Sequence, residues 1–210
     1  MNLTVRLILR VLVTLLLFFT LTITTQVGGL FLLAGLFMRQ HLSTIRSWVF
    51  TLGLYVLSVF TVIPLLASLG NRQALPLSGN LRPLNLVTCL LNRHYVKSDI
   101  LMGLRYTADQ MEQKYPGCMI LYLDANFPFF NGFPLLPHLS HNDGKKIDLS
   151  FQYDLARGGF ASGTPSPIGY GYYESPKKGE TNYEDYCASK GYWQYGFIGR
   201  LVPTIKEAFS

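Results

Sequence analysis

The sequence predicts an α+β chain in which two N-terminal membrane helices precede a small soluble domain. Two uncharged runs, residues 11–37 and 47–71, each exceed the roughly 20 apolar residues that one bilayer crossing needs. After these runs, one helical pattern and two strand patterns alternate with turn-rich segments. The chain therefore divides into a two-helix membrane anchor over residues 1–70, a linker over 71–83 and a soluble domain over 84–210.

Charge is distributed unevenly along the chain. Residues 1–98 contain eight Lys and Arg and no Asp or Glu, whereas residues 99–210 contain ten basic and twelve acidic residues. The net charge of +6 therefore belongs to the apolar N-terminal half and its flanks, as in membrane-embedded segments. This distribution indicates membrane lipid as a partner and does not support a nucleic-acid partner.

The first apolar run is longer than one crossing requires, and it either tilts or breaks at Gly28 and Gly29, where a helix is weakest. Pro64 in the second run is tolerated in a membrane helix and would kink it. A cleaved signal peptide would have a shorter apolar core of about 7–15 residues. We therefore expect two spans, with the N-terminus and the soluble domain on the same side of the membrane. Basic residues flank the first run almost equally, so the positive-inside rule does not choose that side.

The soluble domain begins with a predicted helix from Ser98 to about Tyr115, which a Pro-Gly pair ends. The segment "CMILYLDA", residues 118–125, predicts a buried strand. Apolar and polar residues alternate again from Lys146, which predicts a second strand with Asp148 on its more polar face.

Two further segments follow this pair of strands. Residues 157–185 are rich in Gly, Ser, Pro and Tyr, which indicates a long surface insertion. The tail from about Glu184 to Ser210 is predicted to be helical, with an interruption near Pro203.

The three cysteines give little support to a cysteine-based metal site, because they show no CxxC spacing. In an oxidising compartment two of them could pair and leave one free, and the sequence does not choose which. The residues concerned are Cys89, Cys118 and Cys187.

A cluster of potential metal ligands lies in "LPHLSHNDGKKIDL". His138 and His141 are three residues apart, and Asp148 follows seven residues after His141. Gly144 permits a tight turn with positive φ, so the loop that carries His141 can fold back toward the strand of Asp148. Imidazole and carboxylate are good zinc ligands, and a catalytic zinc site uses three protein ligands and one open position. The alternative is a set of hydrogen-bonded polar groups at the surface.

The segment "HLSHNDGKKID" resembles the S-H-x-x-G-x-x-x-D motif of the LAS-type zinc peptidases, with the closest likeness to penicillin-insensitive murein endopeptidases and D-Ala-D-Ala carboxypeptidases. The resemblance implies a small antiparallel-sheet domain and Zn²⁺ as cofactor. It implies His141 and Asp148 as metal ligands, with His138 as an accessory histidine close to the metal. It also implies a peptidase that acts on peptidoglycan peptides, in the bacterial inner membrane, with the soluble domain on the extracytoplasmic side.

The chain departs from the family pattern after His141. LAS-type peptidases complete the site with a histidine near the C-terminus, commonly in an H-x-H arrangement, and a further His or Glu serves as general base. No histidine follows His141 in this sequence, so no catalytic base and no third ligand are assigned. We expect the C-terminal ligand segment to be missing. Two alternatives stay open: an inactive domain that binds cell-wall material or a protein partner without catalysis, and an accidental likeness.

Two carboxylates and two histidines that do not occupy the ligand positions of the motif receive structural interpretations. Asp143 lies in the "NDGK" turn, where Asp is favoured for backbone reasons. Asp124 ends a predicted strand, and we expect it to cap the following loop. His41 and His94 are expected to be structural or interfacial.

Overall fold

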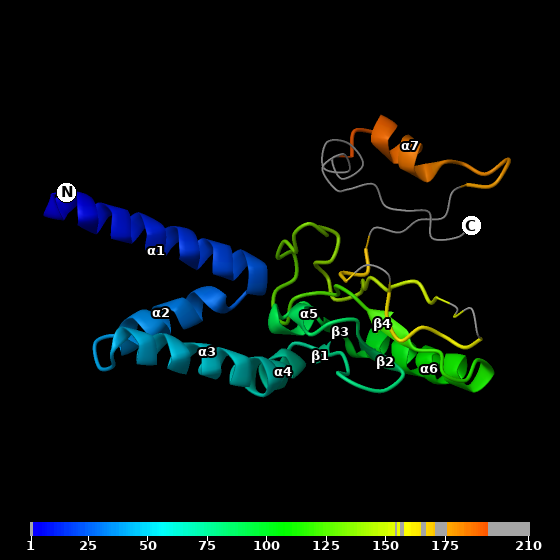
Figure 1. Ribbon diagram of the computed structural model, residues 1–210, viewed down its shortest axis with the longest axis horizontal. Coiled ribbons are helices and arrows are strands. Elements are labelled where there is room, and N and C mark those ends of the chain that lie inside the picture. Colours follow the sequence, from blue (N-terminus) through cyan, green and yellow to red (C-terminus); the bar gives the residue numbers. More distant parts are fainter. Residues whose placement is uncertain (1, 154, 156–157, 165–166, 171–175, 193–210) are drawn as a thin grey trace. The chain divides into compact units, whose positions relative to one another are not determined.

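The computed structural model describes residues 2–153, 155, 158–164, 167–170 and 176–192 of the chain. It divides into two compact units, Met1–Thr164 and Pro165–Ser210. The first unit contains six helices and four short strands among its described residues, so the predicted α+β class is confirmed (Figure 1).

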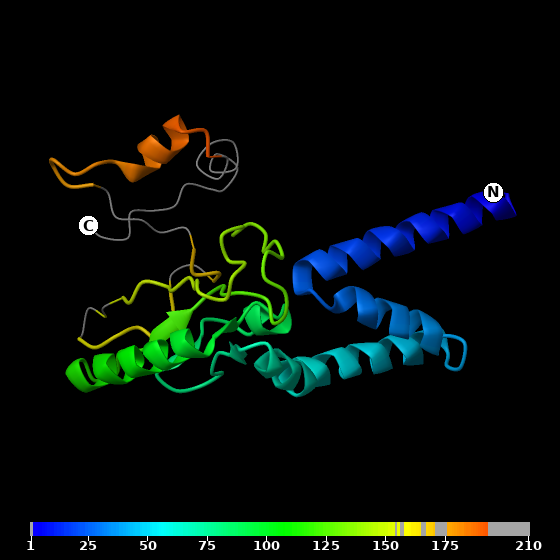
Figure 2. The ribbon, with the colours of Figure 1, turned by 180° about the vertical axis from the view of Figure 1, so that it is seen from behind.

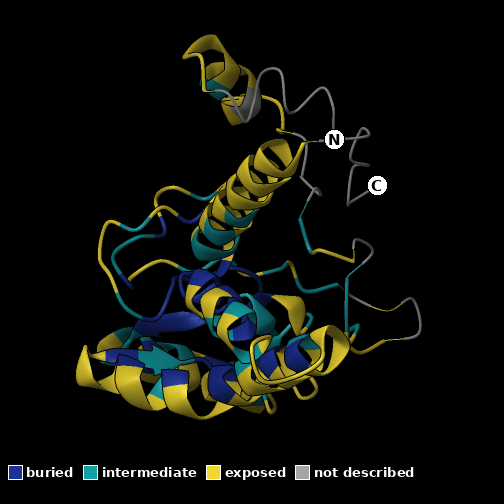
Figure 3. Cartoon of the chain, turned by 90° about the vertical axis from the view of Figure 1, so that its left-hand side faces the viewer, coloured by how far each residue is buried: buried dark blue, intermediate teal, exposed yellow. Residues whose placement is uncertain are grey.

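The N-terminal third of the chain is helical. α1 is the one helix among the described residues that is long and apolar enough to cross a membrane by itself. It is exposed along most of its length (Figure 3), as expected of a helix whose apolar side chains face lipid. α3 and α4 meet the same criterion only when taken together, and they are bent by 44°. The four helices are α1 (Leu3–Thr25), α2 (Gly28–Met38), α3 (Thr44–Phe60) and α4 (Val62–Leu69).

Residues 11–37, which were expected to form a single crossing, belong to two helices in the structure. α1 ends at Thr25, and α2 folds back along it (Figure 1). A Cβ atom on Gly28 would lie 2.6 Å from Thr25 Oγ1, so the glycine pair allows the two helices to pack closely. The eleven residues of α2 rise about 16 Å, roughly half of a bilayer core. The second run also breaks, because the Pro64 ring would clash with the carbonyl of Phe60, where α3 ends.

Within the described residues, the part of the first unit that follows α4, residues 70–164 and called the soluble part below, contains four strands of three residues each. One pair is antiparallel and the other parallel, so the expected antiparallel sheet is only half correct. The pairs are β1 (Arg72–Ala74) with β3 (Tyr95–Lys97), and β2 (Leu81–Pro83) with β4 (Ile120–Tyr122).

The segment over residues 71–83, which was predicted to be a linker, supplies β1 and β2. Its side chains also enter the core: Leu75 and Leu81 are buried, and so is Arg72. The Pro- and Gly-rich composition therefore marks the turns between two short strands and does not mark a solvated tether.

The predicted helix from Ser98 to about Tyr115 is confirmed as α6 (Ser98–Lys114), and a short helix, α5 (Val87–Leu90), precedes it. β4 lies within the predicted strand over residues 118–125. The predicted second strand is reduced to the bridge between Leu149 and Tyr122 and its flanking hydrogen bonds. The core cluster of the soluble part consists of Leu75, Leu81, Cys89, Val96, Leu101, Ala108, Tyr122 and Ala125.

The second unit contains α7 (Tyr183–Ser189) among its described residues. The tail predicted as helical from about Glu184 to Ser210 is therefore helical at its start. Its part from residue 193 onward lies outside the described residues, as do parts of the surface insertion predicted over residues 157–185.

The burial of His94 is expected to make the stability of the soluble part depend on pH. Its side chain is buried next to β3 with its ring tilted against that of Tyr95, and burial lowers its pKa to about 4. An unfolded histidine titrates near 6.5, so between these values the unfolded state binds more protons. We expect the free energy of unfolding to fall by about 3 kcal/mol as the pH drops through this window.

Chemical denaturation at pH 7 and pH 4, on the wild type and on His94→Gln, measures this effect. The variant should lose less free energy of unfolding on acidification than the wild type, since glutamine does not titrate. Equal losses in the two proteins would show that His94 is not the group responsible.

Candidate metal centre

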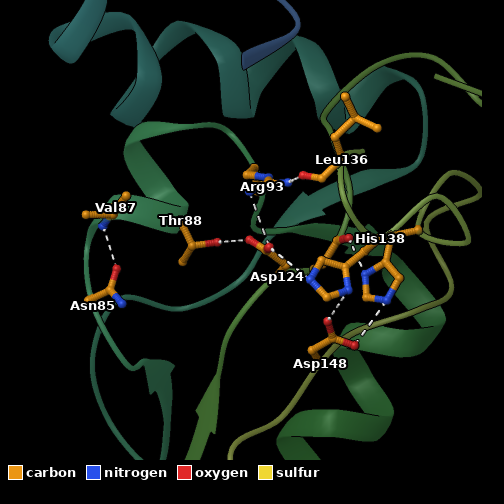
Figure 4. Close-up of polar contacts among 10 residues, drawn as sticks. Asn85, Val87, Thr88, Arg93, Asp124, Leu136, His138 and Asp148 are labelled. Carbon is orange, nitrogen blue, oxygen red and sulfur yellow. Dashed lines mark hydrogen bonds and ion pairs between the residues drawn. The ribbon is translucent and has the colours of Figure 1, made fainter. Parts of the chain in front are cut away.

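The structure brings together the three residues that the motif singled out (Figure 4). The distance from His141 Nε2 to Asp148 Oδ1 is 3.1 Å, and that from His138 Nδ1 to Asp148 Oδ2 is 3.2 Å. One donor atom from each residue lies within 4.8 Å of the other two. His138, expected as an accessory histidine, therefore offers a third potential donor atom beside those of His141 and Asp148.

These distances fit a shared cation. Ligand atoms at tetrahedral positions about 2.0–2.1 Å from zinc lie about 3.3 Å from one another. The observed 3.1 and 3.2 Å are similar, and they join the two imidazoles to different oxygens of Asp148. The donor set of two imidazoles and one carboxylate is also chemically suited to zinc. His138 and Asp148 keep 26% of their side-chain surfaces exposed, so water and a ligand can reach this point from solvent.

His141 is oriented by the end of the predicted strand over residues 118–125. Its ring is buried, and Nδ1 donates a hydrogen bond to the Ala125 carbonyl at 2.8 Å. A carbonyl can only accept, so the Nδ1 proton is fixed and Nε2 faces Asp148. Burial lowers the pKa of His141, but the hydrogen bond and charge of Asp148 and the Ala125 carbonyl outweigh it and raise the pKa overall. Without a cation, Nε2 therefore tends to hold a proton against the carboxylate, and a metal ion would replace that proton.

His138 is oriented by a second carboxylate. Its Nδ1 faces Asp148, while its Nε2 lies 3.8 Å from Asp124 Oδ2. Burial is the largest cause that lowers the pKa of His138; the charges of Asp148 and Asp124 raise it and those of His141 and Arg93 lower it, so the pKa is lowered overall. The neutral imidazole is the form that binds metals. An imidazole held between a metal and a second carboxylate is the usual outer support of a histidine ligand.

Asp124 is the residue that sequence reasoning missed. It was expected to cap a loop, but its carboxylate lies 3.3 Å from Arg93 Nη1 and accepts a hydrogen bond from Thr88 Oγ1 at 3.2 Å (Figure 4). Arg93 also donates to the Leu136 carbonyl, two residues before His138. Asp124 and Arg93 thus connect the strand end to the histidine loop. One feature of the sequence could have indicated this role: Asp124 is a carboxylate at the end of a predicted strand, and that strand end pairs with the segment of Asp148.

Backbone contacts place Asp148 and the turn before it. The Asp148 N–H donates to the Asp124 carbonyl at 2.8 Å, which holds the two carboxylate residues on neighbouring segments. Asn126 is fully buried, accepts from Gly144 N–H at 3.0 Å and donates to the Lys146 carbonyl at 2.7 Å. Asp143 is partly exposed and accepts from Lys145 N–H at 2.9 Å, so it has the turn role that was expected.

The remaining histidines and the cysteines lie outside this cluster. His41 is exposed and packs edge-on against Phe37, and His94 is buried in the core. Cys89, Cys118 and Cys187 are free cysteines.

Comparisons of the chain with protein-family models, with curated proteins and with solved structures found no match.

We expect Asp124→Asn to weaken zinc binding by about 10- to 100-fold, the usual cost of losing an outer carboxylate. The amide would remove the negative charge that faces His138 Nε2 and would leave the Arg93 guanidinium without its ion-pair partner. Competition with a chromophoric chelator measures the affinity. The matched control is Asp143→Asn, a partly exposed carboxylate in the neighbouring turn, which should change the affinity by less than about twofold. Equal losses in the two variants would rule out a specific role for Asp124.

Proposed function

We propose that this protein is a membrane-anchored zinc metallopeptidase-like hydrolase that acts on peptidoglycan peptides. The observation that carries the proposal is the convergence of His138, His141 and Asp148 within metal-binding distance of one another. Three protein ligands and one open position are typical of catalytic zinc, whereas structural sites are closed by a fourth ligand. The substrate class comes from the resemblance of the motif to LAS-type peptidases.

The side chains around the cluster support this chemistry. A bound zinc ion would polarise a peptide carbonyl and lower the pKa of a water molecule. Asp124 favours a proton on His138 Nε2, which leaves the Nδ1 lone pair facing Asp148. The Ala125 carbonyl does the same for His141, by holding the proton on Nδ1. Arg93 adds a fixed positive charge behind Asp124 and limits how far that carboxylate can move.

The proposal includes a bacterial inner-membrane location with the soluble part on the extracytoplasmic side. α2 folds back along α1, so the loop after α2 lies at the same end of the helices as the N-terminus (Figures 1 and 2). All four basic residues of the anchor are exposed at this end, away from the soluble part: Arg6, Arg10, Arg39 and Arg46. By the positive-inside rule this end favours the cytoplasm. That arrangement replaces the expected two-span hairpin by a chain whose N-terminus and soluble part lie on opposite sides.

A hydrolysis assay on the full chain in detergent tests the proposal. Zinc-loaded protein should cleave a cross-linked peptidoglycan peptide, with products identified by mass spectrometry. Chelation should abolish cleavage and added zinc should restore it, whereas His141→Ala should stay inactive at any zinc concentration. Stoichiometric zinc without cleavage would favour the alternative, a non-catalytic domain that binds cell-wall material. Absence of bound zinc would refute the metal site itself.

A further inference from the structure

An uncharged, aromatic segment leads from β4 to the metal centre. Residues 125–140 contain four phenylalanines and no Asp, Glu, Lys or Arg. Several of its apolar side chains face outward: Phe130 is 67% exposed, Leu136 51% and Leu139 48%. Burying side chains of this kind contributes about 1.5–3 kcal/mol each. Their exposure next to the histidines therefore indicates a surface that contacts something apolar.

Polar contacts fix this segment to the end of α1. The Phe129 N–H donates to Gln26 Oε1 at 2.9 Å, directly after the last residue of α1. The Asn92 side chain donates to the Thr25 carbonyl at 3.2 Å, so the chain just before Arg93 is bound to the same helix end. Phe129 also packs against the apolar cluster that contains Val27. Phe129 of the aromatic segment thus lies at the end of α1.

The uncharged part of α1, from Arg10 to its end, and the whole of α2 are each shorter than the hydrocarbon core that they would enter. From Arg10 to Thr25, α1 rises about 22 Å, and α2 rises about 16 Å. The hydrocarbon core is about 30 Å thick. With Arg10 and Arg39 at one interface, hydrocarbon extends roughly 8 Å beyond the end of α1. The aromatic segment, tied to Gln26, begins at that level.

We propose that Phe130, Leu136 and Leu139 insert into the lipid surface, so that the metal centre lies at the boundary between membrane and water. Figure 4 shows Leu136 pointing away from His138 and Asp148, so lipid contact would leave the ligands accessible. The segment also lacks the charged side chains that would oppose insertion. This inference rests on the membrane anchoring in the proposed function and does not depend on whether zinc binds.

Spin labelling of the full chain in phosphatidylcholine–phosphatidylglycerol nanodiscs tests the proposal. A nitroxide is attached at Phe130→Cys in a Cys187→Ser background, since Cys89 and Cys118 are buried. We expect the label to collide readily with molecular oxygen and to be protected from a water-soluble nickel chelate. The matched control is Tyr106→Cys, at an exposed position on α6, where chelate collisions should dominate. Leu139→Cys repeats the measurement on the other side of His138.

Three outcomes distinguish the surfaces that could cover the segment. Oxygen-rich, chelate-poor accessibility at positions 130 and 139 supports insertion into lipid. Chelate accessibility equal to that of the Tyr106 label shows a surface in water and overturns the proposal. Protection from both reagents shows a covering protein segment or second copy, and also overturns it. Zinc content measured on the same samples reports separately on the metal site.

Discussion

Replacing His141 by alanine is expected to abolish zinc binding, with bound zinc falling from about one ion per chain to near zero. The substitution removes the Nε2 donor that lies 3.1 Å from Asp148 and leaves two protein ligands. Losing an outer partner costs about 10- to 100-fold in affinity, so losing a ligand should cost at least 100-fold. Elemental analysis after dialysis against sub-micromolar zinc measures the content.

The control for His141→Ala is His41→Ala, which removes an exposed imidazole that packs against Phe37, far along the chain from the motif. It should retain the wild-type zinc content. His141→Ala also leaves the Ala125 carbonyl without its donor, so both variants are compared by circular dichroism in the presence of chelator. A folded His141→Ala protein with one tightly bound zinc ion would be incompatible with the proposed site.

Gly144→Ala is expected to reduce the free energy of unfolding by about 3–5 kcal/mol. Two costs combine: Gly144 has φ of +81°, where a side chain costs about 1–2 kcal/mol, and its Cβ would lie 2.9 Å from Arg72 Cζ. Arg72 is 2% exposed and donates to the Phe127 carbonyl and to Asn131 Oδ1, so it cannot move without breaking buried hydrogen bonds. Denaturant titration measures the loss.

Gly132→Ala separates these two costs. Gly132 has φ of +78°, but nothing lies within 4 Å of the position that a Cβ would take. The control should therefore lose only the backbone cost of about 1–2 kcal/mol. Similar losses at positions 132 and 144 would show that the contact with Arg72 does not matter, and that the turn tolerates a shift of this guanidinium.

The sequence predicted those parts of the fold whose signals are local. The helix now seen as Ser98–Lys114 has a stop signal directly after it, and the strand that contains Ile120–Tyr122 is a continuous apolar run. β1 and β2 were missed because each has three residues and lies among turn residues. Their partners, Tyr95–Lys97 and Ile120–Tyr122, are distant in sequence, and pairing at such range leaves no local pattern.

The fold-back of α2 was missed for a related reason. Gly28 and Gly29 were interpreted as a weak point within one long helix, whereas in the structure they permit close packing of α2 on α1. Composition reports that a segment is apolar, but not whether its apolar side chains contact lipid or another helix. Because of this break, the loop between α2 and α3 lies at the same end of the helices as the N-terminus. Arg39 and Arg46 are therefore counted together with Arg6 and Arg10 when the positive-inside rule is applied.

The residues of the candidate site also divide into those that a local sequence pattern predicted and those that it did not. The spacing of His141, Gly144 and Asp148 is local, and it was sufficient to single out a cluster that the structure does bring together. Asp124 and Arg93 belong to the site through contacts between segments 31 residues apart in sequence. Their roles depend on the pairing of the Asp148 segment with the strand end, which the spacing of the motif does not contain.

X-ray absorption at the zinc edge, recorded on the full chain with one equivalent of zinc, tests the central claim most directly. If His138, His141 and Asp148 share one cation, the spectrum should show nitrogen and oxygen neighbours at about 2.0–2.1 Å, with outer-shell scattering from two imidazole rings. The second imidazole contribution should disappear in His138→Ala. A spectrum with sulfur neighbours near 2.3 Å, or with no imidazole scattering, would place the metal elsewhere and contradict the account.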